Sequence, residues 1–221
     1  MCASAVIPKG DKFRLSKQAA RLSFIRRFCF LSLYLLVFSL PLAGCSKVVM
    51  RPYVSDSFKA GKMAILPFDN LSAAQGASKT MENLVLVEFL RFPIFTIVEP
   101  GQVSAVLSEA RVRLATSMSK ETVIKLGKDL GVDLLMLSVV HEYEVKRFSG
   151  AGGSGESPVV AISVRILETQ TGNIVWAANV NRTGNDKEVV FGIGRIKSIN
   201  ELAAEVAIEL ARSCAAAFGQ R

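Results

Sequence analysis

The chain has 221 residues, half of them hydrophobic, with 27 Lys and Arg against 19 Asp and Glu. Seven of the basic residues but only one acidic residue lie within the first 44 positions, so the other 177 residues carry 20 basic against 18 acidic side chains. This near balance excludes a nucleic-acid-binding domain as the reason for the net charge of +8. The length beyond residue 44 suits one domain with its own core.

The first 46 residues contain an export signal. Arg26 and Arg27 precede an uncharged apolar run over residues 28–40, and Pro41 and small residues follow it. The run is too short for a good membrane span, which needs roughly 20 apolar residues. Leu42-Ala43-Gly44-Cys45 resembles the lipobox of bacterial lipoproteins, in which the peptidase cleaves between Gly44 and Cys45 and the cysteine thiol is lipidated. The alternatives are an ordinary signal peptide that ends near a cysteine, and an uncleaved anchor.

The leader divides the chain into three predicted parts. Residues 1–44 are the signal peptide, 45–60 a lipidated tether rich in serine, and 61–221 a folded α/β domain. A signal usually has about 15–30 residues. Two explanations of the extra length stay open: Met1 lies upstream of the true start, or the first two dozen residues are an extended basic region.

The four cysteines do not predict a disulfide framework. Cys2 and Cys29 would leave with the leader and Cys45 would carry lipid, so Cys214 has no intramolecular partner. A cysteine-based metal site is excluded for the same reason. We expect Cys214 to be a buried small hydrophobe on a C-terminal helix, with an intermolecular disulfide as the alternative.

Beyond the tether, the spacing of apolar residues predicts alternating strands and helices in a single layered domain. The first strand must end or lie at a sheet edge at Pro67, because proline cannot donate to a sheet ladder. Ser119 is a candidate N-cap and Gly131 a candidate stop for one helix, and Gly172 can take the positive φ of a hairpin turn. In order, the predicted elements are strand 62–68, a helix within 73–90, strand 94–98, a helix around 103–110, helix 120–130, strand 132–140, hairpin strands 159–167 and 174–180, and a helix after a capping box at 198–201.

No motif predicts a catalytic residue, a metal site or a cofactor. Residues 150–155 fit the spelling G-x-G-x-x-G, but a strand follows instead of a helix, so we expect a flexible loop. The only histidine, His141, has no nucleophile or further ligands at suitable spacing and is expected to be solvated at a strand end. Trp176 is expected to pack in the core or on the sheet. Residues 191–195 are expected to form a loop over the sheet, with a partner-docking segment as the alternative.

The order of these features resembles the CsgG-like family of bacterial envelope lipoproteins, which includes the curli secretion component and the LpoB-like and FlgO-like periplasmic lipoproteins. The matching pieces are the lipobox at Cys45 and residues 63–68, 95–109, 126–135 and 164–175. The resemblance covers nearly all of the chain beyond the leader. It implies a mixed β-sheet flanked by helices.

The resemblance also implies a function without catalysis. We expect a lipoprotein held in the outer membrane by acyl chains that include palmitate, with its domain in the periplasm as an assembly or regulatory partner of an envelope protein. By resemblance to lipoprotein sorting in Gram-negative bacteria, Ser46 after the lipidated cysteine favours the outer membrane. Self-association into a homo-oligomer stays open.

The rival expectation is a subunit of an oligomeric CsgG-like secretion channel in the outer membrane. Such a subunit inserts two β-hairpins into the membrane, and each membrane strand needs roughly 9–11 residues of alternating apolar character. The two places for such hairpins are residues 146–158 and 183–197. The first is rich in Gly and Ser, and the second has one brief apolar patch at 189–191. Neither predicts a membrane hairpin.

Overall fold

The computed structural model describes residues 50–112, 117–150, 153–188 and 192–219, with the backbone alone for 148–150, 153–154 and 218–219. The predicted cleavage site at Gly44 and the predicted lipid site at Cys45 lie outside these ranges. Residues 1–46 and 47–221 separate into two units, and only the second contains described residues.

The centre of this unit is a mixed sheet of seven strands in the order β1-β7-β6-β5-β2-β4, with β3 also paired to β5. The pairs β2–β4, β2–β5 and β3–β5 are parallel, whereas β5–β6, β6–β7 and β1–β7 are antiparallel. The predicted mixed sheet flanked by helices is therefore confirmed. The strands are β1 Tyr53–Val54, β2 Gly61–Ile65, β3 Asp69–Asn70, β4 Phe95–Ile97, β5 Leu134–Gly150, β6 Gly153–Glu168 and β7 Ile174–Thr183.

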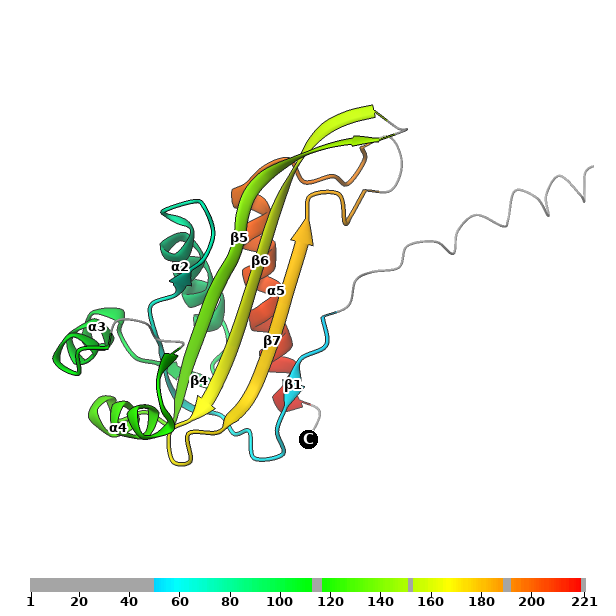
Figure 1. Ribbon diagram of the computed structural model, residues 1–221. Coiled ribbons are helices and arrows are strands. Elements are labelled where there is room, and N and C mark those ends of the chain that lie inside the picture. The colour runs from blue at the N-terminus through cyan, green and yellow to red at the C-terminus, as the bar shows by residue number, and fades with distance from the viewer. Residues whose placement is uncertain (1–49, 113–116, 151–152, 189–191, 220–221) are drawn as a thin grey trace, which may run out of the picture. The chain divides into compact units, whose positions relative to one another are not determined.

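Helices cover the two faces of the sheet unequally (Figure 1). Two of them, α2 Ala77–Leu90 and α5 Ile199–Gly219, pack in one large apolar cluster with residues from β2, β4, β5, β6 and β7. The other two, α3 Pro100–Glu109 and α4 Lys120–Leu130, form a smaller cluster over β2 and the start of β5. Only Leu167 of β6 packs against this second cluster. Among the described residues, helices thus cover both faces of the sheet at one end and one face elsewhere.

Local sequence signals account for the helix ends. The Ser119 side chain accepts a hydrogen bond from the Thr122 amide at 3.3 Å, and Gly131 ends α4 with a φ of 62°. Pro100 begins α3, where the carboxylate of Glu99 accepts a bond from the Gln102 amide at 3.0 Å. These contacts satisfy backbone groups that the helices leave unpaired. Both predicted boundaries of α4 are confirmed.

The strand predicted to end at Val140 extends to Gly150, and the loop predicted at 150–155 is wrong for the described residues. Phe148 pairs with Gly155 and Gly150 with Gly153 in an antiparallel ladder, so the glycines belong to a hairpin. The ladder shifts register between Val140 and Glu142, which makes His141 the extra residue of a β-bulge. Backbone pairing continues the hairpin where charged residues and glycines outnumber apolar ones, which is why the hydrophobic pattern failed to indicate it.

The segment predicted as a tether also takes part in the fold. Tyr53 pairs with Ala177 and Val54 with Trp176, so β1 forms one edge of the sheet. Phe58 is 3 % exposed and belongs to the large apolar cluster. The tether prediction is therefore wrong for residues 53–58, because two residues of backbone pairing and one buried aromatic ring hold them to the domain.

Candidate partner-binding surface

A partly accessible face of the domain lies on β5, β6 and β7, on the side away from α2 and α5. Along β6 the residues that alternate with the buried Val164 and Ile166 are Ser163 and Arg165, both half-buried. On β7, Asn179 is exposed between buried neighbours. We define the open face by the residues Val139, His141, Ala161, Ser163, Arg165, Ala177, Asn179 and Asn181.

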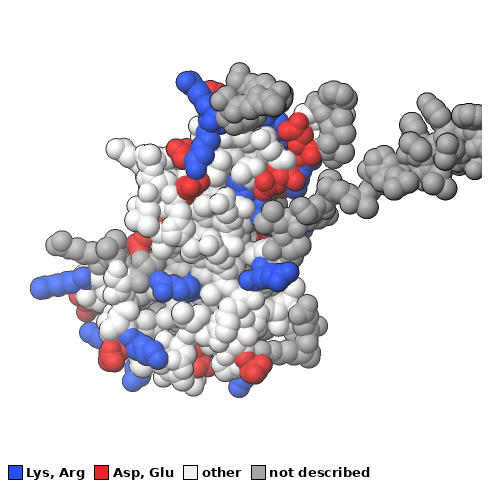
Figure 2. Space-filling model, turned by 45° about the vertical axis from the view of Figure 1, so that its right-hand side comes forward, with Lys and Arg blue, Asp and Glu red and all other residues white. Residues whose placement is uncertain are grey.

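Most residues of the open face are uncharged. In Figure 1, β5, β6 and β7 run in front of α5, and Figure 2 shows acidic and basic side chains mixed at the two ends of the visible surface, with mostly white surface and some basic side chains between them. Small and amide side chains can hydrogen-bond a partner without the desolvation cost of a bare charge. The arrangement suits recognition of another protein better than chemistry on a small molecule.

The bulge places His141 on this face. Its Nε2 atom lies 2.7 Å from Oγ of Ser163, and the histidine is exposed, as predicted. This spacing allows a base to activate a hydroxyl, but catalysis also needs a third group that orients the base. In the described residues no carboxylate bonds to the other ring nitrogen of His141. The pair therefore places two polar groups side by side on the sheet surface.

Charges line the hairpin beyond the bulge, where β5 and β6 run past the end of β7. The Lys146 ammonium lies 2.7 Å from Glu142 and 3.6 Å from Glu144, and Arg147 lies 3.0 Å from Glu156. The hydrogen bond to Glu142 is the main cause that raises the pKa of Lys146 above its usual value. These pairs keep both signs of charge on the distal hairpin.

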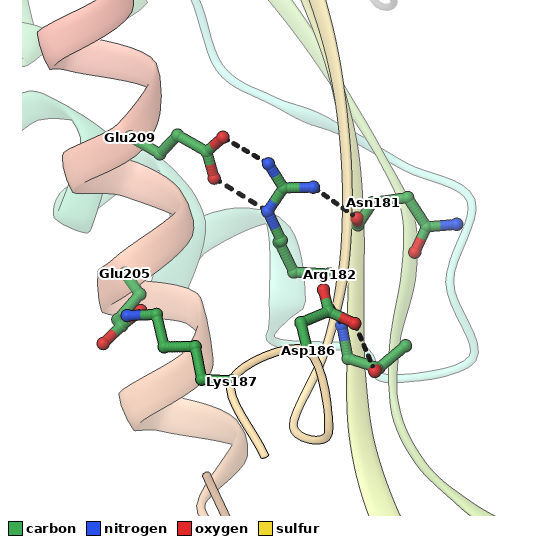
Figure 3. Close-up of polar contacts among 7 residues, drawn as sticks. Asn181, Arg182, Asp186, Lys187, Glu205 and Glu209 are labelled. Carbon is green, nitrogen blue, oxygen red and sulfur yellow. Dashed lines mark hydrogen bonds and ion pairs between the residues drawn. The ribbon is translucent and has the colours of Figure 1, made fainter. Parts of the chain in front are cut away.

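A second polar group ties β7 to α5 at the same end of the domain (Figure 3). Nε of Arg182 donates to Glu209 at 2.9 Å, and its Nη2 donates to the other oxygen of the same carboxylate. In the segment after β7, Asp186 accepts from the Thr183 hydroxyl at 2.7 Å, and Lys187 pairs with Glu205. The bidentate Arg182 pair holds the end of β7 against the helix.

The remaining singled-out residues are structural. Cys214 is fully buried on α5, and burial raises the pKa of its thiol well above the usual range. Trp176 is also fully buried, in the large cluster. Both predictions are confirmed. Of the segment 191–195, residues 192–194 form a turn, whereas residue 191 lies outside the described ranges.

Neither a metal site nor a spanning helix is found in what the structure describes. Within those ranges, His, Cys, Asp and Glu side chains form no group of three or more that could hold a metal ion. The helices found there are not both long enough and apolar enough to cross a bilayer.

Sequence reasoning missed the open face, although a signal for it existed. Buried and accessible residues alternate along β6 and β7, and this period of two is typical of a sheet with one covered face. The apolar Val and Ile residues indicated the hairpin, and the polar residues between them marked the side that no described helix covers. Which helix covered which face depended on the tertiary packing.

Similar folds occur among solved structures. The PelC dodecamer from Paraburkholderia phytofirmans is 16 % identical over 73 % of this chain and 93 % of that one, with a TM-score of 0.49. Lipoprotein GNA1162 from Neisseria meningitidis is 15 % identical over 68 % and 98 %, with a TM-score of 0.46. The LpoB C-terminal domain from Escherichia coli is 13 % identical over 58 % and 87 %, with a TM-score of 0.42. No curated protein matches the chain.

A family model matches most of the domain. The matched residues, 54–217, begin inside β1 and end near the C-terminal end of α5, so the match spans the whole sheet and all four described helices. The model describes the curli production assembly/transport component CsgG. The resemblance predicted from the sequence motifs is thereby confirmed: the chain belongs to the CsgG family.

Proposed function

We propose that this protein is an outer-membrane lipoprotein, attached through Cys45, whose domain faces the periplasm and acts as a non-enzymatic assembly or regulatory partner of another envelope protein. In this proposal residues 1–44 are removed, Cys45 becomes the first residue and carries acyl chains that include palmitate, and Ser46 directs the protein to the outer membrane. The observation that carries the binding role is the open face, an accessible and mostly uncharged sheet surface.

The lipid anchor and the open face support each other physically. Several acyl chains on one residue give lasting attachment, since each buried methylene contributes about 0.8 kcal/mol. A domain confined to the membrane surface meets other envelope proteins at a raised effective concentration. A weak, polar interface on the open face is then sufficient for a specific complex.

The distal hairpin favours this role over that of a channel subunit. Glu144 and Lys146 stand on one side of β5, and Arg147 on the other, where it pairs with Glu156 of β6. A membrane-inserted strand presents apolar residues to the lipid at every second position, and a charge at the bilayer midplane costs about 2–4 kcal/mol. Charges on both sides suit a hairpin in water.

The first experiment tests the anchor. Cells producing the full chain are labelled with radioactive palmitate, with and without globomycin. We expect label in the wild type and in Cys29→Ala but none in Cys45→Ala, and an unprocessed precursor under globomycin. Fractionation should place the wild type in the outer membrane and Ser46→Asp in the inner membrane. Processing that ignores globomycin, with no palmitate incorporated, would refute the lipoprotein assignment.

The second experiment tests the binding role. A photo-crosslinking residue is placed at Asn179 on the open face and, as a matched control, at Asp129 on the outer side of α4; both positions are exposed. We expect a discrete envelope protein to crosslink from position 179 only, and the crosslink to weaken when Ala177→Arg is added. A heat-labile, SDS-resistant oligomer that conducts ions in planar bilayers would instead support the channel.

A further inference from the structure

The outer edge of β5 beyond the bulge is a free strand edge. The last backbone bond on that side runs from the Leu71 amide to the Val140 carbonyl at 2.8 Å, yet β5 continues to Gly150. Among the described residues no strand pairs with that side of β5 past Val140. Residues 144–147 are exposed, and Val145 is 49 % accessible. Such an edge readily accepts another strand.

The hydrogen-bonding pattern shows which residues direct their amides to this edge. Before the bulge, the carbonyls of Met136 and Val140 accept bonds from the neighbouring segment at 3.0 and 2.8 Å, so even-numbered residues face outward there. The bulge shifts the ladder with β6 by one residue. Because the amides of alternate residues point to opposite edges, those of Tyr143, Val145 and Arg147 face outward beyond the bulge.

The free edge carries both acidic and basic residues, so the edges of two copies can place opposite charges next to each other. Its two acidic and two basic residues are Glu142, Glu144, Lys146 and Arg147. We propose that a second copy of this chain pairs antiparallel with this edge about a two-fold axis at Val145, placing Glu144 opposite Lys146 of the partner subunit. By symmetry, Lys146 then faces the partner's Glu144.

Geometry and charge exclude the adjacent registers. In an antiparallel pair, a residue whose amide points to the shared edge must lie opposite a partner residue whose amide also points there. Because only alternate residues do so, the two-fold axis has to pass through a residue and cannot lie midway between two residues. An axis at Glu144 would set the two Glu144 carboxylates directly opposite each other, and like charges in that position are destabilising. The axis at Val145 instead brings two exposed apolar side chains together.

The interface closes on itself. A two-fold axis uses the same edge on both copies, so pairing ends at a dimer and does not propagate into a filament. The interface is narrow, and the pairing gains from confinement of both copies to one membrane surface. That gain rests on the proposed lipid anchor, whereas the register rests on the strand alone.

Cysteine crosslinking tests the register. Full-length Glu144→Cys and Lys146→Cys chains with different tags are coexpressed in a Gram-negative host and oxidised. Side chains at directly opposed positions that do not share backbone hydrogen bonds approach closely enough for a disulfide. We expect the mixed disulfide as the main product and little linkage between two Glu144→Cys chains. A dominant Glu144→Cys homodimer, or no dimer in the membrane, would overturn the proposal.

Charge reversal tests the pairing without cysteines. Dimer formation is measured by fluorescence energy transfer between labelled full-length chains in bilayers. Glu144→Lys or Lys146→Glu alone should weaken self-association about tenfold, since two opposed pairs become repulsive. Mixing these two variants should restore association, and so should the double variant. Glu201→Lys, a matched change on α5, should have no effect.

Equal association of all variants would refute the interface, and so would a different protein occupying the edge while the chain stays monomeric. Palmitate labelling without dimerisation would leave the anchor intact, so the two proposals fail separately.

Discussion

The two ends of the sheet differ in what covers them. Where β2 and β4 lie beside the start of β5, helices pack on both faces, and residues 134–137 form a continuous apolar run with every side chain buried. In the distal part of β5 and β6, one face is open, apolar and polar residues alternate, and ion pairs line the hairpin. One end of the sheet is thus held by burial on both faces, whereas the other end leaves side chains of one face partly accessible.

The largest loss of stability should come from a substitution at the end of the sheet where helices cover both faces. Leu135→Ala removes a fully buried side chain that packs with α3 and α4, and we expect the free energy of unfolding to fall by about 2–5 kcal/mol. The matched change Val145→Ala, on the distal hairpin, should change it by less than about 0.5 kcal/mol. Urea unfolding of the processed chain measures both values. Similar losses at the two sites would contradict the comparison.

A glycine contact between α4 and the β6–β7 turn gives the next effect. A Cβ at Gly127 would lie 2.2 Å from Cβ of Thr169, whose hydroxyl donates to the Val132 carbonyl at 2.7 Å. Gly127→Ala should therefore cost about 1–3 kcal/mol through overpacking. Gly76→Ala, where a Cβ meets nothing within 4 Å, should be neutral or stabilise by up to about 1 kcal/mol. If thermal unfolding showed Gly76→Ala to be less stable than Gly127→Ala, the contact between Gly127 and Thr169 would be unimportant.

The smallest changes in the free energy of unfolding should come from the two ion pairs on α5, and they should differ from each other. Arg182 has 14 % of its side chain exposed and binds Glu209 with two bonds, so Arg182→Met should cost about 1–2 kcal/mol. Lys187 is 60 % exposed, and Lys187→Met should cost about 0–1 kcal/mol. Repeating the urea titration in 1 M salt should abolish the effect at Lys187 and keep most of that at Arg182. Equal sensitivity to salt would argue against a structural role for Arg182.

Much of the fold could be predicted because its signals are local. The cap at Ser119 and the left-handed residue Gly131 lie next to the helix that they bound, and the apolar run at 132–140 indicated a strand, of which residues 134–137 are all buried. The distal half of β5 had only a weak signal, since Tyr143 and Val145 are the only apolar residues between Glu142 and Arg147 and both alternate with charged residues. Its strand character comes from pairing with residues of β6 that are nine or more positions away.

The candidate surface was less predictable than the elements that build it. The sequence predicts that Cys214 is buried and that Trp176 packs in the core or on the sheet, and both are buried. It did not reveal that β1 and Phe58 complete the domain, because a two-residue strand has too few positions to show a period. Nor did it place His141 beside Ser163, since the bulge that does so exists only in the paired ladder.

By itself, the sequence determined the family, the predicted leader with its lipobox, and the kinds of most elements, because caps, turns and periodicity act over a few residues. The tertiary structure alone decided that helices cover one end of the sheet on both faces and leave the distal strands open on one. It also decided where, among the described residues, β5 stops pairing on the side away from β6. Both features depend on contacts between segments distant in the chain, whose formation is governed by the burial of apolar area and by backbone pairing across the whole domain.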